Sequence, residues 1–227
     1  MFLFSHWYFR LTQPTLYRKS ATTTFGLSVK YNGAKHPARA SAFWLAPGVL
    51  CTARHVVENT LWIWAHPKGG GMIAVKPDNV HIVPSADIAF IRVPELSAPC
   101  PATFAEAGPQ TPLLMLRTPF GITTVLRAEE PVRAHARYFN AHVDDFRYTQ
   151  DWMFSQHDNM MVTTHPTIPG DSGSALFDES GNVVGMVIQR VTSAQHRQTP
   201  EDGWQHLSFA IPVADILAEA VKLGIPL

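Results

Sequence analysis

Short strand-like runs, separated by turn residues, recur along most of the chain and limit the folds open to it. Each run is rich in Val, Ile, Thr, Phe or Trp, and the intervals hold turn-forming pairs such as Asn32-Gly33 and Pro47-Gly48. Short strands at this spacing are typical of a β-sandwich or a β-barrel. The predicted strands are 24–31, 42–45, 61–65, 72–75, 88–93, 113–116, 122–127, 160–164, 174–177, 183–189 and 206–211.

One segment near the C-terminus predicts a longer helix. After Pro212 the apolar residues are spaced by three and four from Val213 to Leu223, and Gly224 and Pro226 then end the pattern. One short helical turn is expected at 52–58. The fold class predicted from these patterns is all-β with a C-terminal α-helix.

Length and composition bound the number of domains and the kinds of partner. The chain has 227 residues, which fits one large all-β domain or two small ones. Apolar residues make up 46% and charged residues 16%, which allows a full core and argues against a disordered protein. Lys and Arg together number 18, as do Asp and Glu, and no basic run stands out. We therefore expect no nucleic-acid or anionic-membrane partner.

The N-terminus and the cysteines indicate the compartment. Residues 1–10 are aromatic but interrupted by Ser5 and His6, with no basic start and no small-residue cleavage site after them. This pattern differs from a signal peptide, and no apolar stretch is long enough to span a membrane. We therefore expect a cytoplasmic location. Cys51 and Cys100 lie in apolar settings and are expected to be free thiols.

A less regular segment, at about 134–159, gathers aromatic residues among charges and histidines. Long connections of this kind are often lids or partner surfaces. A hairpin with an ordinary aromatic core is the alternative, and the sequence leaves both open.

The strongest chemical signal is a serine between two glycines, in Gly170-Asp171-Ser172-Gly173. Glycine permits the backbone geometry of a tight turn. Such a turn can direct successive backbone N–H groups at one point, which is what an oxyanion hole requires. Taken alone, the tetrapeptide could also be an ordinary hairpin loop.

Two further residues could activate that serine. A serine nucleophile needs a base to take its proton. His55 follows an apolar strand and a short turn, and Asp87 stands directly before the apolar run 88–93. An aspartate drawn inward with its strand could orient the histidine ring. A lone histidine or a strand-edge aspartate is usually structural, so the prediction of catalysis depends on the combination.

These segments carry a family resemblance. Thr52-Ala53-Arg54-His55, Asp87-Ile88-Ala89-Phe90 and Gly170-Asp171-Ser172-Gly173-Ser174 resemble the signature segments of chymotrypsin-like serine peptidases. They occur in that family's order, which differs from the α/β-hydrolase and subtilisin orders. The closing Ser208-Phe209-Ala210-Ile211-Pro212, followed by a helix, is similar to the bacterial high-temperature-requirement branch. The resemblance covers about residues 24–223.

The resemblance implies two antiparallel six-stranded β-barrels packed together, followed by the helix. It implies one peptidase domain over 1–227, with the first barrel at about 20–110, the second at about 111–211 and the helix at 212–223. His55, Asp87 and Ser172 would form the catalytic triad in the crevice between the barrels. The oxyanion hole would lie at Gly170, Asp171 and Ser172, through the N–H groups of the first and last. The chain would then be a serine endopeptidase acting on proteins or peptides, without a cofactor or metal.

Three features depart from the family pattern. In members activated by cleavage, the position of Asp171 pairs with a new N-terminal amine, but no Ile-Val-Gly-Gly-like segment occurs here. Either another group pairs with Asp171, which we favour, or processing near Arg18-Lys19 creates an unusual N-terminus. No cysteine follows His55, so the histidine-loop disulfide is not expected. The chain ends at Leu227, so we expect a bare peptidase unit without a PDZ domain.

The substrate pocket is expected between 165–169, 185–190 and 207–210. Pro166 stands where trypsin-like enzymes carry an aspartate, so Lys or Arg is not expected before the cut. Apolar side chains in the pocket favour a small or medium apolar residue there, whereas His165 or Arg190 would favour an acidic one. The predicted pocket residues are His165, Pro166, Thr167, Val187, Ile188, Gln189, Arg190, Ser208 and Phe209.

Three other functions compete with general proteolysis. The chain could be a catalytically silent or partner-activated relative that binds peptides. It could be a regulatory peptidase with one dedicated protein target. A metal enzyme is disfavoured, because the histidines are scattered and no His-x-x-x-His pattern with a nearby acid occurs on a helix.

Overall fold

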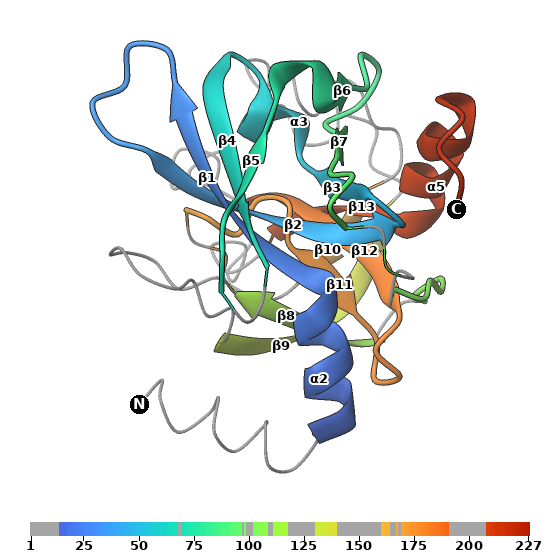
Figure 1. Cartoon of the computed structure of the whole chain (residues 1–227). Coiled ribbons are helices and arrows are strands. Elements are labelled where there is room, and N and C mark those ends of the chain that lie inside the picture. The colour runs from blue at the N-terminus through green and yellow to red at the C-terminus, as the bar shows by residue number, and fades with distance from the viewer. Residues whose placement is uncertain are drawn as a thin grey trace.

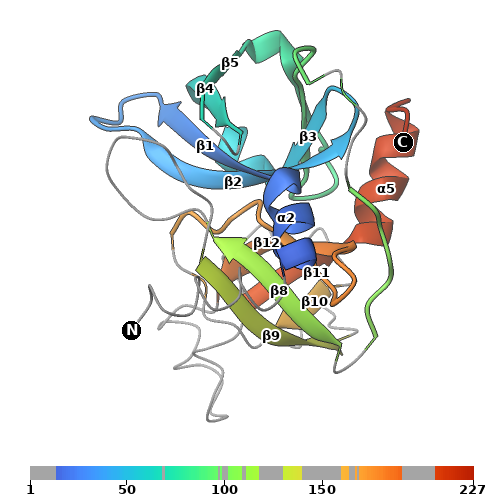
Figure 2. The same ribbon diagram turned by 60° about the horizontal axis from the view of Figure 1, so that its bottom comes forward.

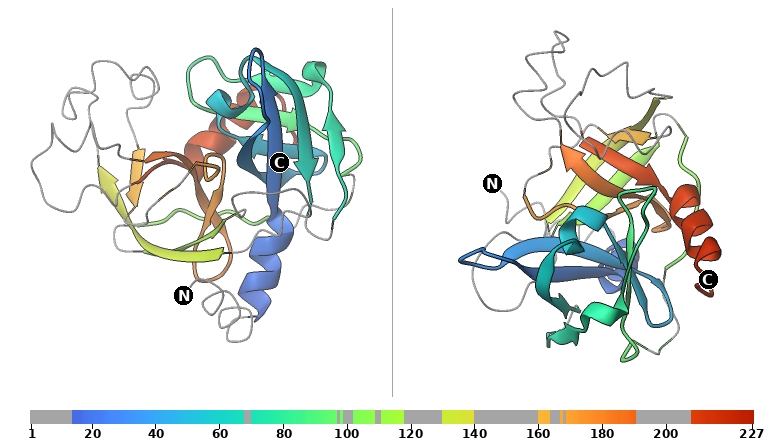
Figure 3. Two further views of the ribbon diagram at one scale, coloured as in Figure 1. Left: turned by 90° about the vertical axis from the view of Figure 1, so that its left-hand side faces the viewer. Right: turned by 90° about the horizontal axis from the view of Figure 1, so that it is seen from above.

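Two β units, one formed by each half of the chain, make up the body of the molecule (Figure 1). They are seen in a computed structural model that describes residues 14–67, 70–96, 98, 102–108, 111–117, 130–139, 160–163, 167, 169–190 and 208–227. Seen from above, the sheet of the first half (blue to green) packs beside the strands of the second half (yellow to red) (Figure 3). The pairs between the named strands are all antiparallel, which fits the all-β expectation.

The first unit is a curled seven-stranded sheet in the order β5-β4-β1-β2-β3-β7-β6. We expected six strands here. The difference arises where a one-turn 3₁₀ helix, η1 (Pro77–Asn79), separates two three-residue strands. Pro77 has no N–H to donate to a strand partner, so β5 and β6 become the two edges of the sheet. The strands are β1 (Thr24–Tyr31), β2 (Ala38–Ala46), β3 (Val49–Thr52), β4 (Thr60–His66), β5 (Ile73–Val75), β6 (Val80–Ile82) and β7 (Ala89–Arg92).

The second unit is a closed six-stranded barrel in the order β10-β13-β12-β11-β8-β9, as expected. Its interior is tightly packed at Gly185 of β12, where a Cβ atom would collide with the Met161 side chain and the Ile211 carbonyl oxygen. The strands are β8 (Pro112–Arg117), β9 (Glu130–Phe139), β10 (Met160–Thr163), β11 (Ala175–Phe177), β12 (Val183–Arg190) and β13 (Ser208–Pro212).

The predicted C-terminal helix is present as α5 (Val213–Lys222). It buries Val213, Ile216 and Ala220 against β12 and β13. This burial follows from the spacing of three and four that predicted the helix. The expected short turn after β3 is also present, as α3 (Arg54–Val57).

A second long helix, α2 (Pro14–Thr23), was not predicted. Its sequence lacks an acidic first turn and ends in β-branched threonines, which are poor helix formers. Tertiary contacts hold it instead: it packs on β1 and β2, and Lys19 donates to the Ser180 carbonyl and the Asn182 side chain at the β11–β12 turn. Figure 2 shows the helix in front of the junction, between the strands of the first unit above it and β8 and β11 of the second unit below it.

Most of the predicted strands coincide with observed strands within a few residues. The pattern did not predict β6, which is only three residues long, or β9, part of which falls in the segment considered irregular. The predicted strand 122–127 and most of the aromatic segment 134–159 lie outside the described residues.

One cysteine lies at the junction of the two units. Cys51 on β3 is fully buried, and its thiol donates to the Met186 sulfur on β12 across 3.8 Å. It is a free thiol, as expected, and burial raises its pKa well above the usual range. Cys100 lies outside the described residues. Among the helices that the structure describes, none is long and apolar enough to cross a membrane.

Candidate active site

The first part of the site comes from two neighbouring strands of the seven-stranded sheet. β3 and β7 pair antiparallel, with Thr52 opposite Ala89. α3 starts two residues after the end of β3, and Asp87 stands two residues before the start of β7. Since these ends of the strands lie side by side, His55 on α3 and Asp87 come together.

Asp87 holds His55 at two points. Its Oδ2 lies 2.8 Å from His55 Nδ1, and its Oδ1 accepts a hydrogen bond from the His55 backbone N–H at 2.9 Å. The Asp87 side chain is 0% exposed, whereas that of His55 is 27% exposed. A buried carboxylate is tolerated when its oxygens are hydrogen-bonded, as they are here. The arrangement fixes the ring and places the proton on Nδ1, so Nε2 keeps a free lone pair.

Arg54 makes further hydrogen bonds beside the His55–Asp87 pair. Its side chain is largely buried, and its guanidinium donates to the Pro84 carbonyl at 2.9 Å and to that of Val83 at 3.5 Å. The segment 83–87 that ends at Asp87 is therefore attached to the helix that carries His55.

The second part of the site is the glycine-flanked turn before β11. Gly170 has a φ of +107° and Gly173 a φ of +86°, values that L-residues with side chains rarely adopt. Ser174 N–H donates to the Asp171 carbonyl at 2.9 Å, and Gly173 N–H donates to the Val187 carbonyl at 2.8 Å. The predicted tight turn is therefore present, and it is anchored to β12 of its own barrel.

The first unit holds the same turn from the other side. On β2, the Ser41 N–H donates to the Ser172 carbonyl at 2.9 Å, and the Ser41 hydroxyl donates to the Gly170 carbonyl at 2.9 Å. Thr52, at the end of β3, donates its hydroxyl to the Ser41 carbonyl at 2.7 Å. A Cβ on Gly173 would collide with that carbonyl and that hydroxyl, so only glycine permits this approach.

The two N–H groups predicted to form the oxyanion hole are not used in hydrogen bonds within the described part of the chain. Among the described residues, neither Gly170 N–H nor Ser172 N–H donates to another protein group. The bond from Ser174 to the Asp171 carbonyl fixes the peptide that carries the Ser172 N–H. Asp171 itself is 1% exposed. The expectation that a group other than a new N-terminus pairs with its carboxyl stays a prediction.

The hydroxyl of Ser172 is turned toward β12 in this structure. Its Oγ donates to the Ile188 carbonyl at 3.3 Å, and within the described residues no hydrogen bond joins it to the His55 ring. Backbone contacts through Ser41 bring the serine turn beside Thr52 at the end of β3, while the Ser172 hydroxyl is held by β12. That Ser172 acts together with His55 and Asp87 stays a prediction.

The described part of the predicted substrate pocket lies on β12 and β13. These strands pair with Val187 opposite Ala210 and Gln189 opposite Phe209, with a bulge between. Thr167 and Ser208, both buried, share a hydrogen bond of 2.8 Å between their hydroxyls. Their assignment to a substrate pocket stays a prediction.

The other described residues of the predicted pocket lie mostly in the barrel interior. Val187, Ile188 and Phe209 are buried in the barrel, and Gln189 is half-buried. The Arg190 backbone pairs with Ser208. His165, Pro166 and the side chain of Arg190 lie outside the described residues.

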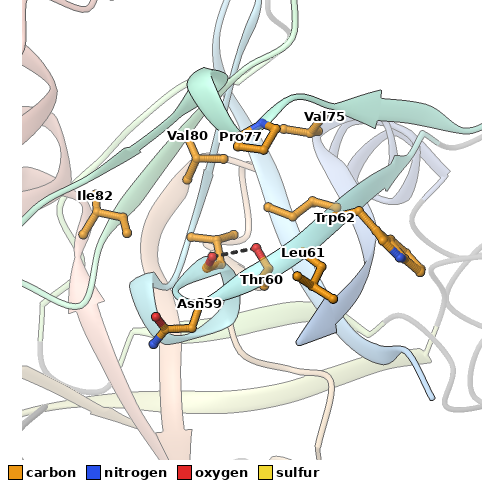
Figure 4. Close-up of a pocket in the computed structure, with 10 residues that line it drawn as sticks. Asn59, Thr60, Leu61, Trp62, Val75, Pro77, Val80 and Ile82 are labelled. Atoms are coloured by element: carbon orange, nitrogen blue, oxygen red, sulfur yellow. Dashed lines mark hydrogen bonds between the residues drawn. The ribbon is translucent and has the colours of Figure 1, made fainter. Parts of the chain in front are cut away.

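A separate cavity of about 170 Å³ opens on the first unit, between β4 and the β5–η1–β6 edge (Figure 4). Two of its lining residues are joined by a hydrogen bond, in which the Thr60 hydroxyl donates to the Val57 carbonyl at 2.8 Å. No predicted triad residue lines this cavity. Its lining residues are Val57, Asn59, Thr60, Leu61, Trp62, Ile63, Val75, Pro77, Val80 and Ile82.

Sequence reasoning missed the role of Ser41. Its only sequence signal is a small polar residue in the apolar run Ala40-Ser41-Ala42, and nothing local indicates that it contacts Gly170, 129 residues later. In the part of the chain that the structure describes, no three His, Cys, Asp or Glu side chains gather closely enough to hold a metal ion.

The fold and the site define a class: paired β units with a buried Asp–His contact from the first and a serine on a tight turn from the second. Residues 40–186, more than half of the chain, match the trypsin-like peptidase domain family. The chain therefore belongs to the trypsin-like peptidase family, which places it among the serine peptidases.

Individual relatives agree with this family. The serine protease Do-like HtrA of Lactococcus lactis is 25% identical over 207 residues, which are 90% of this chain and 47% of that protein. The chain thus spans about half the length of that curated relative. The crystal structure of the active form of the Rv3671c protease from M. tuberculosis has a TM-score of 0.72 at 18% identity, covering 96% of this chain and 88% of that one. The HtrA-type protease AlgW, solved with a tripeptide, has a TM-score of 0.67 at 20% identity, covering 92% and 62%. At these identities the two structures show the shared fold alone.

Proposed function

We propose that the chain is a serine endopeptidase in which Ser172 is the nucleophile, His55 the general base and Asp87 the residue that orients the base. The observation that carries the proposal is the two-point contact of Asp87 with the ring and backbone of His55. That contact leaves Nε2 as the proton acceptor, on a side chain that is partly exposed. A structural histidine would not require this combination of buried acid, fixed ring and open nitrogen.

The chemistry then follows in two halves. Ser172 Oγ attacks the peptide carbonyl carbon and its proton passes to His55 Nε2, giving a tetrahedral oxyanion. The oxyanion collapses, the C–N bond breaks, and His55 returns the proton to the leaving amine. Water repeats the sequence on the acyl-enzyme: its proton goes to His55, the ester bond to Oγ breaks, and Oγ regains a proton.

Main-chain donors would stabilise the negative oxygen. The N–H groups of Gly170 and Ser172 are free of other protein acceptors among the described residues, and contacts from Ser174 and Ser41 fix the peptides around them. Preorganised donors of this kind contribute much of the rate enhancement in acyl transfer, because they need no reorientation as charge develops.

We further infer a selective peptidase that acts on a dedicated protein target in the cytoplasm. Support comes from the burial of Val187, Ile188 and Phe209, which present no open apolar surface of their own to a substrate. Cleavage of one native partner but not of casein would agree with this inference, and broad casein cleavage would contradict it.

The test of the nucleophile is labelling with a fluorophosphonate, which reacts only with an activated serine. We expect an adduct on Ser172, mapped by mass spectrometry, that disappears in Ser172→Ala. Ser180→Ala is the matched control, because Ser180 is exposed and only its backbone is hydrogen-bonded. An adduct on a different serine would overturn the assignment.

A second candidate is a relative that is silent until a partner binds. The hydrogen bond from Ser172 Oγ to the Ile188 carbonyl favours it, since this rotamer is not held by His55. For this candidate we expect no adduct on the folded protein alone and labelling of Ser172 once a partner or peptide is added. Rapid labelling of the isolated protein would exclude it.

A further inference from the structure

The formal net charge of the chain is zero, but its charged residues are unevenly distributed along the sequence. Residues 1–57 contain seven Lys or Arg and no Asp or Glu. Three of these cations, Lys30, Lys35 and Arg39, lie on the β1–β2 hairpin, which extends outward at the upper left in Figure 1. Lys30 donates to the Lys35 carbonyl, and Arg39 donates to a serine hydroxyl, so neither is paired with a described carboxylate.

Arg39 lies beside the candidate active site. It precedes Ser41 by two residues on β2, and residues two apart on a strand point to the same face about 7 Å apart. Ser41 is the residue that donates to the Ser172 and Gly170 carbonyls. The Arg39 side chain therefore lies on the same face of β2 as that of Ser41, two residues before the residue that contacts the serine turn.

A small network fixes the direction of the guanidinium. Arg39 donates to Ser28 Oγ at 2.7 Å, from the cross-strand position on β1, and Ser28 Oγ lies 2.9 Å from His66 Nε2 on β4. Because a guanidinium can only donate, the Ser28 oxygen accepts and its own proton goes to His66. Burial and the nearby Arg39 lower the pKa of His66, so Arg39 carries the charge of this cluster at neutral pH.

The remaining donors of Arg39 suit a carboxylate. One N–H is used by Ser28, and the planar group has others in a fork that binds a carboxylate through two parallel hydrogen bonds. The side chain is half-buried, which strengthens such a pair relative to one in open solvent.

The position of Arg39 relative to Ser172 indicates which part of a substrate it would meet. Ser172 Oγ contacts β12 at Ile188 on one flank, where the acyl part of the substrate is predicted to bind, and Ser41 of β2 contacts the turn on the other flank. The leaving part of the chain would extend along β2, toward Arg39.

We propose that Arg39, positioned by Ser28 and His66, is a carboxylate-binding subsite that selects an acidic side chain on the leaving-group side of the cut bond. This rests on the proposed peptidase function. It predicts a substrate class: protein segments with Asp or Glu within the first few residues after the cut.

The test compares the cut sites of three proteins in a complex peptide library with amidated C-termini, read by mass spectrometry. The wild type should show Asp and Glu enriched roughly tenfold at one position after the cut, as expected for a charge-assisted hydrogen bond. Arg39→Gln should lose the enrichment, and Arg92→Gln, which removes an exposed cation on β7, should keep it. Absence of enrichment in the wild type, or its survival in Arg39→Gln, overturns the proposal. A preference that appears only in peptides with a free C-terminus would assign the carboxylate to the chain end and overturn the side-chain assignment.

A binding measurement separates this proposal from the proposed peptidase function. If no peptide is cut, the peptidase function fails, and the subsite is judged on fluorescence anisotropy of labelled peptides with Ser172→Ala protein. Tighter binding of a Glu peptide than of its Gln counterpart, lost in the Ser172→Ala/Arg39→Gln double variant, supports the subsite. Equal affinity for the two peptides overturns it.

Discussion

The two β units hold their parts of the site in different ways. In the first unit, His55 follows β3 and Asp87 precedes the adjacent strand β7, and the two residues contact each other directly at 2.8 Å and 2.9 Å. In the second, the turn that carries Ser172 is held by β12 of its own barrel and by Ser41 of the opposite sheet. The base and its acid are thus built within one unit, whereas the nucleophile depends on how the two units fit together.

The largest effect should come from the pair built within one unit. Asp87→Asn keeps the shape but reverses the donor and acceptor at His55 Nδ1, which favours the wrong tautomer. We expect the turnover number to fall by roughly 10⁴-fold while the protein stays folded. Asp78→Asn, on the exposed η1 turn, is the control and should leave turnover unchanged. A loss below tenfold in Asp87→Asn would mean that His55 is oriented by some other group.

A smaller effect, on both the stability and the turnover number, is expected from a change at the contact between the two units. Gly173→Ala places a methyl group against the Ser41 carbonyl and forces a side chain into a positive φ. Overpacking and backbone strain should together lower the free energy of unfolding by about 2–4 kcal/mol, with turnover reduced in parallel.

Gly33→Ala is the matched control, because it adds backbone strain without a steric collision. Gly33 also has a positive φ, +77°, but nothing lies within 4 Å of an added Cβ. Gly33→Ala should therefore lose only about 1 kcal/mol in denaturant unfolding and keep full turnover. Equal losses in the two variants would show that the approach of Gly173 to Ser41 contributes nothing.

The smallest effect isolates one hydrogen bond between the units. Ser41→Ala removes the hydroxyl bond to the Gly170 carbonyl and retains the backbone bond to Ser172. We expect stability to fall by about 1 kcal/mol and the turnover number by roughly tenfold, with little change in KM, because the oxyanion donors lose alignment. Ser20→Ala is the comparison: Ser20 lies on α2 and is equally buried, but its hydroxyl has no hydrogen-bond partner among the described residues. Unchanged turnover in Ser41→Ala would limit Ser41 to a structural role.

Features set by residues close in sequence were predicted better than features set by contacts between distant segments. The spacing of apolar residues predicted α5 and most strands, because these features are set by near neighbours. The motifs around His55, Asp87 and Ser172 carried the resemblance to the peptidase family to which the chain belongs. The division of an edge into β5 and β6 and the stabilisation of α2 depend on contacts between distant segments. Ser41 and Arg39 were missed for the same reason, since their roles arise from the register of β2 against β1 and the serine turn.

The labelling rate of the Cys51 thiol can measure how often the interface between the two units opens. It is closed off between β3 and Met186 of β12, and its raised pKa keeps it protonated and unreactive while the units are packed. In a Cys100→Ser background, a thiol reagent could reach Cys51 only when the interface opens. The labelling rate would therefore report how often the half that carries His55 separates from the half that carries Ser172, without any substrate.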